Sequence, residues 1–378
     1  MTLNLLSLIT LFSLTTLFSP TTLSGSIDPM PVDDKGASSN PWLVYQGKAG
    51  AGVGLHIVFV TGDEEYRSEE GMPQIARILA QHHGFRCTVL FSIDRESGEI
   101  DPETLDNIPG LAALKDADLM VIFTRFRDLP DDQMRWIAEY VESGRPVIGL
   151  RTATHAFDLR TNETYRRYSF RNSEWNGGFG RQILGETWIA HHGGHGTQSS
   201  RGIRAAGEKD HPILRGIGDN DVWDPSDVYT VRLPLPEDCR PLLMGQVLSG
   251  MSPGDPPCSP EERDGSVFDK NKPMMPVAWI RLRELDNGKT QRVFTTTLGA
   301  SQGFMHAGNR RLLVNACYWA LNRANEIPKQ SKVDLVGKFE PTPFGFGTHK
   351  KGIRPRDLEQ TDALLSVPAG DEAPEDSH

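Results

Sequence analysis

The sequence contains little cysteine and more acidic than basic residues, and each feature excludes a class of protein. Four cysteines among 378 residues are too few for a disulfide-stabilised scaffold of this length. Asp and Glu outnumber Lys and Arg by 50 to 40, which gives a formal net charge of −10. No long basic run reverses this charge locally. Nucleic acid and stably bound anionic membranes are therefore not expected as partners.

Several common motifs are also missing. The glycines of GKAGAGVG (47–54) precede the first expected strand and no Gly-Lys-Ser/Thr follows, whereas a phosphate-binding loop requires strand, glycines and helix in that order. No HExxH sequence or paired-cysteine motif indicates zinc.

Cys87 and Cys317 are expected to be buried thiols. Cys239 and Cys258 share a loop-rich region and are candidates for a disulfide after export.

Both ends of the chain differ in composition from its centre. Residues 1–26 are apolar, rich in Leu, Phe and Thr, and end in small residues, which is typical of a secretory signal peptide. An early Lys or Arg is missing, and a membrane anchor is the alternative, which the repeated Ser and Thr disfavour. We therefore expect an exported protein, periplasmic or extracellular. Residues 27–54 are expected to form a linker and residues 326–378 a poorly packed, partly disordered tail.

Between residues 55 and 325, strand-like and helix-like segments alternate. The expected strands are 55–60, 87–91, 118–123 and 146–150, and the expected helices are 69–84 and 130–144. Further strands are expected at 227–233, 241–248, 275–282 and 292–298, a helix at 309–321 and an insertion loop at 249–274. Strand–helix–strand alternation with short connections predicts an α/β domain, with a mostly parallel sheet covered by helices on both faces.

Ligands of such sheets bind beyond the carboxyl ends of the strands, and four expected strand ends carry reactive side chains. The candidates from these ends are Asp63, Glu64, Glu65 and Tyr66, then Arg125 and Arg127, then Arg151, Thr152 and His155, and finally Ser301 and Gln302. Arg–carboxylate pairs can also simply hold loops together. The crowding of carboxylates, arginines, hydroxyls and imidazoles favours a functional crevice.

The stretch TWIAHHGGHGT (187–197) places His191, His192 and His195 within five positions. A catalytic zinc takes three protein ligands and keeps an open position, but Gly193 and Gly194 leave the geometry of these histidines undefined. Two alternatives are a solvent-exposed turn and a metal site. In the second, one of these histidines would bind the metal together with Glu64, Glu65 or His155. We interpret the stretch as a ligand-facing loop whose histidines bind substrate or transfer protons, and no cofactor is expected.

Aromatic and acidic residues near these loops suit a carbohydrate, whose C–H faces stack on rings and whose hydroxyls bind carboxylates. Tyr66 and Trp175 are the aromatic candidates, with Trp188 and Trp223 as weaker ones that equally suit a core. Asp227 is a further candidate, together with its neighbours Asp224 and Tyr229 in VWDPSDVY.

The combination of motifs resembles the ThuA-like family, which is named for trehalose utilisation. The similarity runs colinearly over about residues 55–325, and the motifs that carry it are TGDEEYRSEEGMPQIARIL, RPVIGLRTATHAF, GGFGRQILGETWIAHHGGHG, HPILRGI, DVYTVRLPLP and GKTQRVFTTTLGASQ. GLRTATHAF and TTTLGASQ are also similar to a subgroup common in planctomycete-type bacteria. The resemblance implies a class I glutamine amidotransferase-like, flavodoxin-like fold.

True amidotransferases of this fold carry a nucleophilic Cys on the sharp turn after the strand that corresponds to PVIGL (146–150). This chain has RTATH there and no nearby cysteine, so glutaminase chemistry is not expected. The resemblance instead implies acid–base chemistry on a disaccharide or keto-glycoside of the trehalose type, by isomerisation or cleavage. Glu64 or Glu65 and one histidine would handle protons, while Arg125 and Arg151 would position oxygens.

Two other functions remain open at the level of sequence. One is a non-catalytic carbohydrate-binding or accessory protein, and the other is a metal-dependent hydrolase that uses the histidines of residues 191–195. The sequence does not decide between a monomer and a homo-oligomer.

Overall fold

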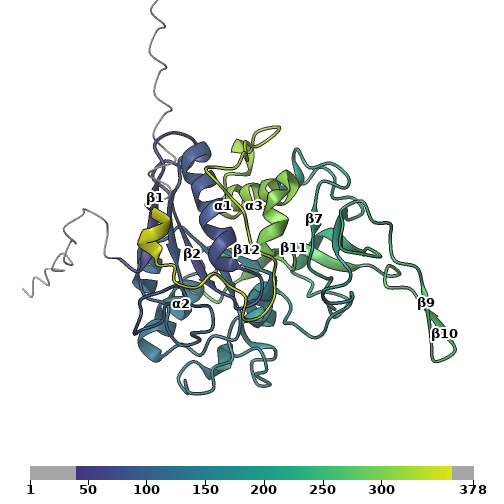
Figure 1. Cartoon of the computed structure of the whole chain (residues 1–378), viewed down its shortest axis with the longest axis horizontal. Helices are drawn as coiled ribbons and strands as arrows, with labels where there is room; N and C mark the ends of the chain where they lie inside the picture. The colour runs from purple at the N-terminus through teal and green to yellow at the C-terminus, as the bar shows by residue number, and fades with distance from the viewer. Residues whose placement is uncertain (1–39, 360–378) are drawn as a thin grey trace, which may run out of the picture.

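A computed structural model describes residues 40–359. The expected signal peptide (1–26), the first part of the expected linker (27–39) and the end of the expected tail (360–378) lie outside these residues. Ten strands form one mixed sheet in the order β1-β3-β2-β4-β5-β12-β11-β8-β6-β7 (Figure 1). These strands are β1 Trp42–Gln46, β2 His56–Gly62, β3 Arg86–Leu90, β4 Leu119–Thr124, β5 Val147–Leu150, β6 Ser200–Arg204, β7 Trp223–Asp224, β8 Cys239–Val247, β11 Met275–Glu284 and β12 Thr290–Thr296.

The five central strands run parallel, and antiparallel strands extend the sheet at both edges. Every residue of β2, β4 and β5 is buried, which is why these strands appear in the sequence as continuous apolar runs rather than as an alternating pattern.

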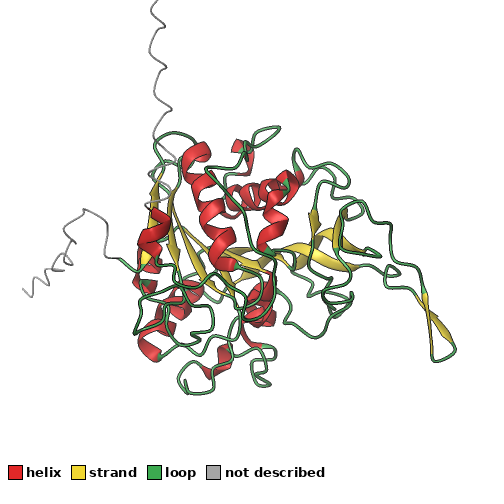
Figure 2. Ribbon diagram, viewed as in Figure 1, coloured by secondary structure: helices red, strands yellow, loops and turns green. Residues whose placement is uncertain are grey.

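Helices cover both faces of the sheet (Figure 2). The α-helices are α1 Ser68–His83, α2 Asp131–Glu142 and α3 Ala307–Ala320. Successive side chains of β2 point to opposite faces: Ile57 packs in the same hydrophobic cluster as α1 and α3, and Val58 packs in the same cluster as α2. The predicted α/β class and helical coverage are confirmed.

Short helical turns complete the connections, and one of them, η2, begins directly after a strand, β5. The 3-10 turns are η1 Leu111–Asp116, η2 Arg151–His155, η3 Arg166–Tyr168, η5 Pro212–Leu214, η6 Ser301–Met305 and η7 Ala324–Glu326, and η4 Gly180–Leu184 is a π-helical turn. Within residues 40–359, none of the helices is both long and apolar enough for a bilayer crossing.

The structure differs from the sequence-based expectation in four segments. Part of the expected linker 27–54 is β1, which pairs antiparallel with β3. The expected strand at 227–233 is a loop with one isolated bridge, between His191 and Tyr229. The expected insertion loop 249–274 contains a hairpin, which projects from the body in Figure 1 and consists of β9 Glu261–Arg263 and β10 Ser266–Phe268.

The fourth difference concerns the expected tail, because residues 326–359 are packed. Val333 and Phe339 are buried in the core cluster that contains α1 and α3. The segment runs alongside α1 and ends beside β1 (Figure 1). Hydrogen bonds from Thr342 and Lys350 to Glu70 of α1 attach it to this helix.

All four cysteines are free thiols. Cys87 and Cys317 are buried, as predicted. The candidate disulfide between Cys239 and Cys258 is not formed: the Cys239 thiol contacts Asp238, while the Cys258 thiol accepts a hydrogen bond from Asn271.

Candidate functional site

The strand ends predicted to converge do lie together. Asp63, directly after β2, accepts a hydrogen bond from the hydroxyl of Thr152 in η2, after β5. Its other carboxylate oxygen accepts the backbone N–H groups of Glu65 and Tyr66. Asp63 therefore fixes the turn that carries Glu65 and Tyr66. Because Asp63 is fully buried, it positions these residues and does not itself face a ligand in solvent.

Arg151 forms the buried centre of the site. It occupies the sharp turn after β5 with φ of 44°, an uncommon backbone conformation for a residue with a large side chain. Its guanidinium donates to the carbonyl oxygens of Asp227 (2.6 Å) and Thr297 (2.7 Å), the Tyr66 hydroxyl (2.9 Å) and Asp227 Oδ1 (2.8 Å). The ring of Tyr229 lies 3.7 Å from the guanidinium carbon. Arg151 thus occupies the turn after β5, and no cysteine lies on that turn.

Asp227 is fully buried above Arg151 and faces two histidines. His191 Nδ1 lies 2.8 Å from Asp227 Oδ2, and His195 Nδ1 lies 3.4 Å from Asp227 Oδ1. Burial alone would raise the pKa of Asp227, but the charge of Arg151 and the hydrogen bonds of the two histidines outweigh it and hold this pKa well below its usual range. Asp227 is therefore an anion at neutral pH.

Glu65 lies on the other side of His195. Its Oε1 is 3.1 Å from His195 Nε2, and burial raises the pKa of this carboxyl above its ordinary value. The hydrogen bond with Asp227 raises the pKa of His195. The side chains of His191 and His195 are 39% and 38% exposed while that of Asp227 is 0% exposed, so the cluster opens to solvent through its imidazoles. Glu65, His191, His195 and Asp227 are named the His–carboxylate cluster below.

Glu64 is held apart from this cluster. Both of its carboxylate oxygens are engaged, one by Arg125 and one by Arg127 at 2.8 Å. Arg127 is fully buried. It also donates to the Ser92 hydroxyl and to the carbonyl oxygens of Pro102 and Thr104, which follow β3, so it links the loops after β2, β3 and β4. Of the two glutamates expected to transfer protons, Glu65 is the remaining candidate, because both oxygens of Glu64 are paired with arginines.

His155 is enclosed by aromatic rings. Phe126, Phe170, Trp188 and Tyr229 have ring centroids 5.1–6.1 Å from its imidazole. Burial lowers the pKa of His155 well below its ordinary value, so this residue stays neutral and packs beneath the site. The structure does not bring it to the solvent-facing side where proton transfer to a ligand would occur.

The structure also places His192 and Trp175 away from the cluster. His192 Nε2 lies 2.7 Å from the carbonyl oxygen of Lys270, and the imidazole approaches Phe268 of β10. Trp175 packs edge-on against Tyr168, with ring centroids 5.1 Å apart. The adjacent residues His191 and His192 thus point in different directions: the imidazole of His191 faces the site and that of His192 faces away from it.

Ser301 and Gln302, in η6, hold neighbouring backbone. The Ser301 hydroxyl donates to the carbonyl of Arg67, and Gln302 Oε1 accepts the N–H of Phe344. Ser301 therefore supports the loop after β2, and Gln302 attaches the C-terminal segment.

The C-terminal segment contributes residues that sequence reasoning missed. The N–H of Gly345 donates to the carbonyl of Glu65 at 2.8 Å. Phe344 stacks on Tyr66 with ring centroids 5.2 Å apart and lies 5.9 Å from the His195 ring. Phe346 is 54% exposed and lies 5.0 Å from the guanidinium carbon of Arg125. The sequence signal was the pair of aromatic residues in PTPFGFG, which is unusual for an unpacked tail.

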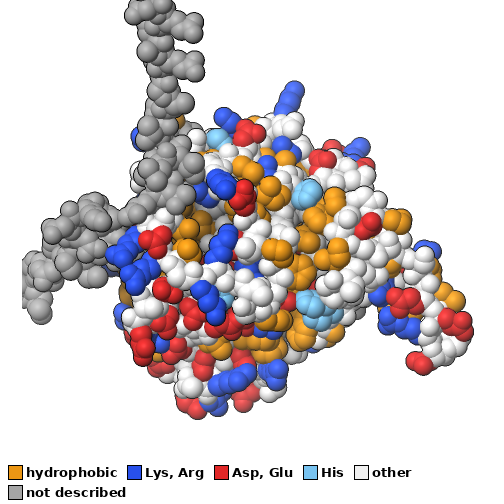
Figure 3. Space-filling model, viewed as in Figure 1, with side chains coloured by type: hydrophobic (Ala, Val, Ile, Leu, Met, Phe, Trp, Pro, Cys, Tyr) orange, Lys and Arg blue, Asp and Glu red, His pale blue; other side chains and the backbone are white. Residues whose placement is uncertain are grey.

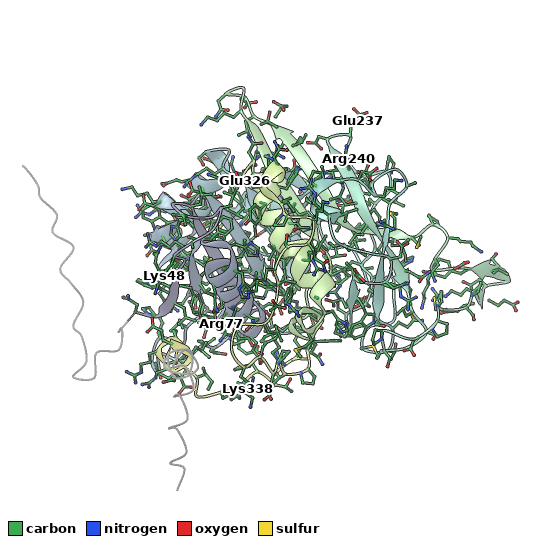
Figure 4. The ribbon with its side chains drawn as sticks, turned by 90° about the horizontal axis from the view of Figure 1, so that it is seen from above. Lys48, Arg77, Glu237, Arg240, Glu326 and Lys338 are labelled. Carbon is green, nitrogen blue, oxygen red and sulfur yellow. The ribbon has the colours of Figure 1, made fainter. Side chains whose placement is uncertain are left out.

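Two surface hollows lie elsewhere. Their linings include Tyr45 of β1 and Arg77 of α1, together with Lys338 or Lys48, and neither lining includes a member of the His–carboxylate cluster. Figure 4 shows Lys48, Arg77 and Lys338 on the side of the molecule where β1 lies. The site is therefore identified by the grouping of histidine and carboxylate side chains and not by the size of a cavity.

The glycines of GGFG (177–180) have a packing role. Gly178 has φ of 52°, and a Cβ at Gly178 or Gly180 would overlap a backbone carbonyl oxygen, that of Ser169 or Thr154 respectively. This close approach seats the turn before η4 against η2, beneath the site.

Replacing Gly180 by Ala is expected to lower the free energy of unfolding by about 1–3 kcal/mol, because fixed backbone must move to admit the methyl group. Gly254→Ala is the matched control, since a Cβ there meets nothing within 4 Å, and it should change stability by less than about 0.5 kcal/mol. Urea denaturation followed by circular dichroism measures both. Equal stability of the two variants would contradict the packing role.

The fold and site together define an α/β protein with a mixed sheet whose central strands are parallel, an arginine on the turn after β5 and an open His–carboxylate cluster. The family model of ThuA, described as trehalose utilisation, matches residues 56–320. The chain belongs to this family.

Solved structures with a similar fold include two ThuA-like proteins. One, from Bacteroides uniformis ATCC 8492, is 14% identical, covers 73% of this chain and 95% of its own, and superposes with a TM-score of 0.44. The other, from Parabacteroides merdae ATCC 43184, is 16% identical, covers 77% of this chain and 97% of its own, and has a TM-score of 0.43. No curated protein matches the sequence.

Proposed function

We propose that the protein is an exported enzyme that acts by acid–base chemistry on a disaccharide or keto-glycoside of the trehalose type. The observation that carries the proposal is the 3.1 Å approach of Glu65 Oε1 to His195 Nε2 at the open side of the cluster. A carboxylate and an imidazole at this distance form a pair that can remove a proton from one substrate atom and return it to another.

The surroundings of this pair supply the remaining requirements. Arg125 has a partly exposed side chain (19%) beside Glu65, with its Nε 4.0 Å from Glu65 Oε2, and it can bind a sugar oxygen or an oxyanion. Phe344 and Phe346 offer ring faces next to these polar groups, the combination that suits a carbohydrate. The family description, trehalose utilisation, supports the choice of substrate class.

The export part of the proposal rests on the apolar, Ser/Thr-rich sequence of residues 1–26. Charge on the visible surface agrees with a small-molecule ligand: on the face shown in Figure 3, Lys/Arg and Asp/Glu are interspersed and no broad basic patch covers it. N-terminal sequencing of the protein recovered from the source cells would test export, with a start near residue 27 as the expected result.

The experiment that tests the activity incubates the purified protein with trehalose, other disaccharides and their keto derivatives, and follows the sugars by NMR. Conversion of at least one compound is the expected result. Binding without any conversion would overturn catalysis and leave the alternative, a carbohydrate-binding accessory protein, which the absence of a cysteine on the turn after β5 also favours. If the protein neither binds nor converts any of these sugars, the carbohydrate proposal is overturned.

A substitution of Phe346 tests where the sugar binds. Phe346→Ala is expected to raise the Kd about 3- to 10-fold, which corresponds to the loss of one stacking contact of about 0.5–1.5 kcal/mol. Its Tm should not change, because the ring is 54% exposed. Phe268→Ala is the matched control, since this partly exposed ring lies on the β9–β10 hairpin. Calorimetric titration measures both, and equal affinities would place the sugar elsewhere.

A further inference from the structure

We propose that His191, His195 and Asp227 bind one divalent first-row transition-metal ion. One ligand atom from each residue can be chosen such that all three lie within 4.8 Å of one another. This inference concerns the site of the proposed function and does not depend on the identity of the substrate. With an ion bound through His195 Nδ1, Glu65 rather than His195 would be the group that transfers the proton.

The distances between the ligand atoms fit a metal ion. His191 Nδ1 and His195 Nδ1 lie 2.8 and 3.4 Å from the two oxygens of Asp227. For metal–ligand bonds of about 2.0–2.2 Å, neighbouring ligand atoms of a tetrahedral or octahedral centre are roughly 2.9–3.5 Å apart. The two imidazoles approach different oxygens of Asp227, and the ligand atoms lie within 4.8 Å of one another, so a shared ion would draw the three side chains closer together.

Residues outside the three ligands hold them as the outer partners of metal sites do. Arg151 donates to Asp227 Oδ1 and to its backbone carbonyl, which fixes the carboxylate from below. Glu65 Oε1 lies 3.1 Å from His195 Nε2, the ring nitrogen that would not bind the metal. A carboxylate that accepts a hydrogen bond from the distal nitrogen fixes the tautomer and orientation of a ligating histidine. Glu65 Oε1 has no other hydrogen-bond partner among the described residues, so it is available for this role.

The cluster also has the accessibility of a reactive site. The two imidazoles are 39% and 38% exposed, so an ion there would keep positions open for water or a substrate oxygen. Two imidazoles and one carboxylate favour zinc, manganese, iron or cobalt, whereas calcium and magnesium prefer all-oxygen ligands. The competing explanation is that Asp227 only accepts hydrogen bonds from two imidazoles.

The test uses the full mature chain, purified without an affinity tag, stripped with EDTA and dialysed against Zn²⁺ or Mn²⁺ in the absence of sugar. Bound metal is measured by elemental mass spectrometry. The double variant His191→Ala/His195→Ala removes two ligands, and His192→Ala is the matched control because its imidazole faces the carbonyl of Lys270 instead.

We expect about one ion per chain in the wild-type protein and in His192→Ala, and at least a 100-fold weaker affinity in the double variant. Less than about one tenth of an ion per wild-type chain, or equal binding by the double variant, would overturn the proposal. Circular dichroism of the metal-free proteins checks folding, and if the double variant does not fold, the single variants His191→Asn and His195→Asn replace it. Because no sugar is present, failure here leaves the carbohydrate proposal standing.

Discussion

Glu65→Gln is expected to lower the turnover of the sugar substrate by about 10²- to 10⁴-fold, the usual contribution of a general acid or base. The amide keeps the size of the carboxyl group but neither accepts nor releases the transferred proton. The Kd should stay within about threefold, because the aromatic rings and Arg125 that would contact the sugar are unchanged. NMR progress curves measure the turnover and calorimetric titration the Kd.

The matched control is Glu163→Gln, a change of the same chemistry at a carboxyl group that is 78% exposed and paired with Arg166. It should leave both quantities at wild-type values. Turnover by Glu65→Gln within about threefold of wild type would remove Glu65 from the mechanism. Loss of affinity in parallel with turnover would instead assign Glu65 to binding.

Arg151→Met is expected to lower the free energy of unfolding by about 3–5 kcal/mol, the cost of leaving one partner of a buried ion pair uncompensated. Arg151 and Asp227 both have side chains with 0% exposure, so the carboxylate would remain buried without its guanidinium partner. The variant also loses donors to the carbonyl oxygens of Asp227 and Thr297. Urea denaturation, followed by circular dichroism, measures the change.

Two further variants make this result interpretable. Arg160→Met removes an arginine that is 76% exposed in its pair with Asp158, and it should change stability by less than about 1 kcal/mol. Arg151→Met/Asp227→Asn should lose less than the sum of its single changes, because the unpaired charge is gone. A loss below about 1 kcal/mol for Arg151→Met would contradict the inference that the buried Arg151–Asp227 pair stabilises the fold.

The parts of the fold that the sequence predicted are those with local signals. β2, β4 and β5 were visible as apolar runs because they are buried on both faces. α1 was bounded by Gly84, whose φ of 82° ends the helix. The convergence of strand ends followed from the topology of parallel sheets alone.

The parts that were missed depend on contacts between distant residues. β1 contains the short apolar run WLVY (42–45), which lies between segments rich in Gly, Pro and Ser, so local composition favours a linker there. Only Leu43 of this strand is buried, and its partner strand β3 lies about 40 residues away in sequence. The packed course of residues 326–359 depends on partners such as Glu70 that lie more than 250 residues away in sequence. Local composition carries no information about such pairings.

The candidate site shows the same division. The sequence grouped the three histidines of residues 191–195, but only the fold shows that His192 turns toward Lys270 while its neighbours face Asp227. Glu64 and Glu65 are adjacent in sequence and equivalent in composition. They differ because Arg125 and Arg127 occupy both oxygens of Glu64, a consequence of where the loop after β4 lies.

Calorimetric titration with trehalose and its keto form tests whether the His–carboxylate cluster is the sugar site. Wild-type protein is compared with His195→Ala and His192→Ala, whose imidazoles lie three positions apart in one loop but face different partners. We expect binding by wild type and His192→Ala, and at least a tenfold weaker affinity for His195→Ala. No binding by wild type, or equal affinities for the two variants, would contradict it.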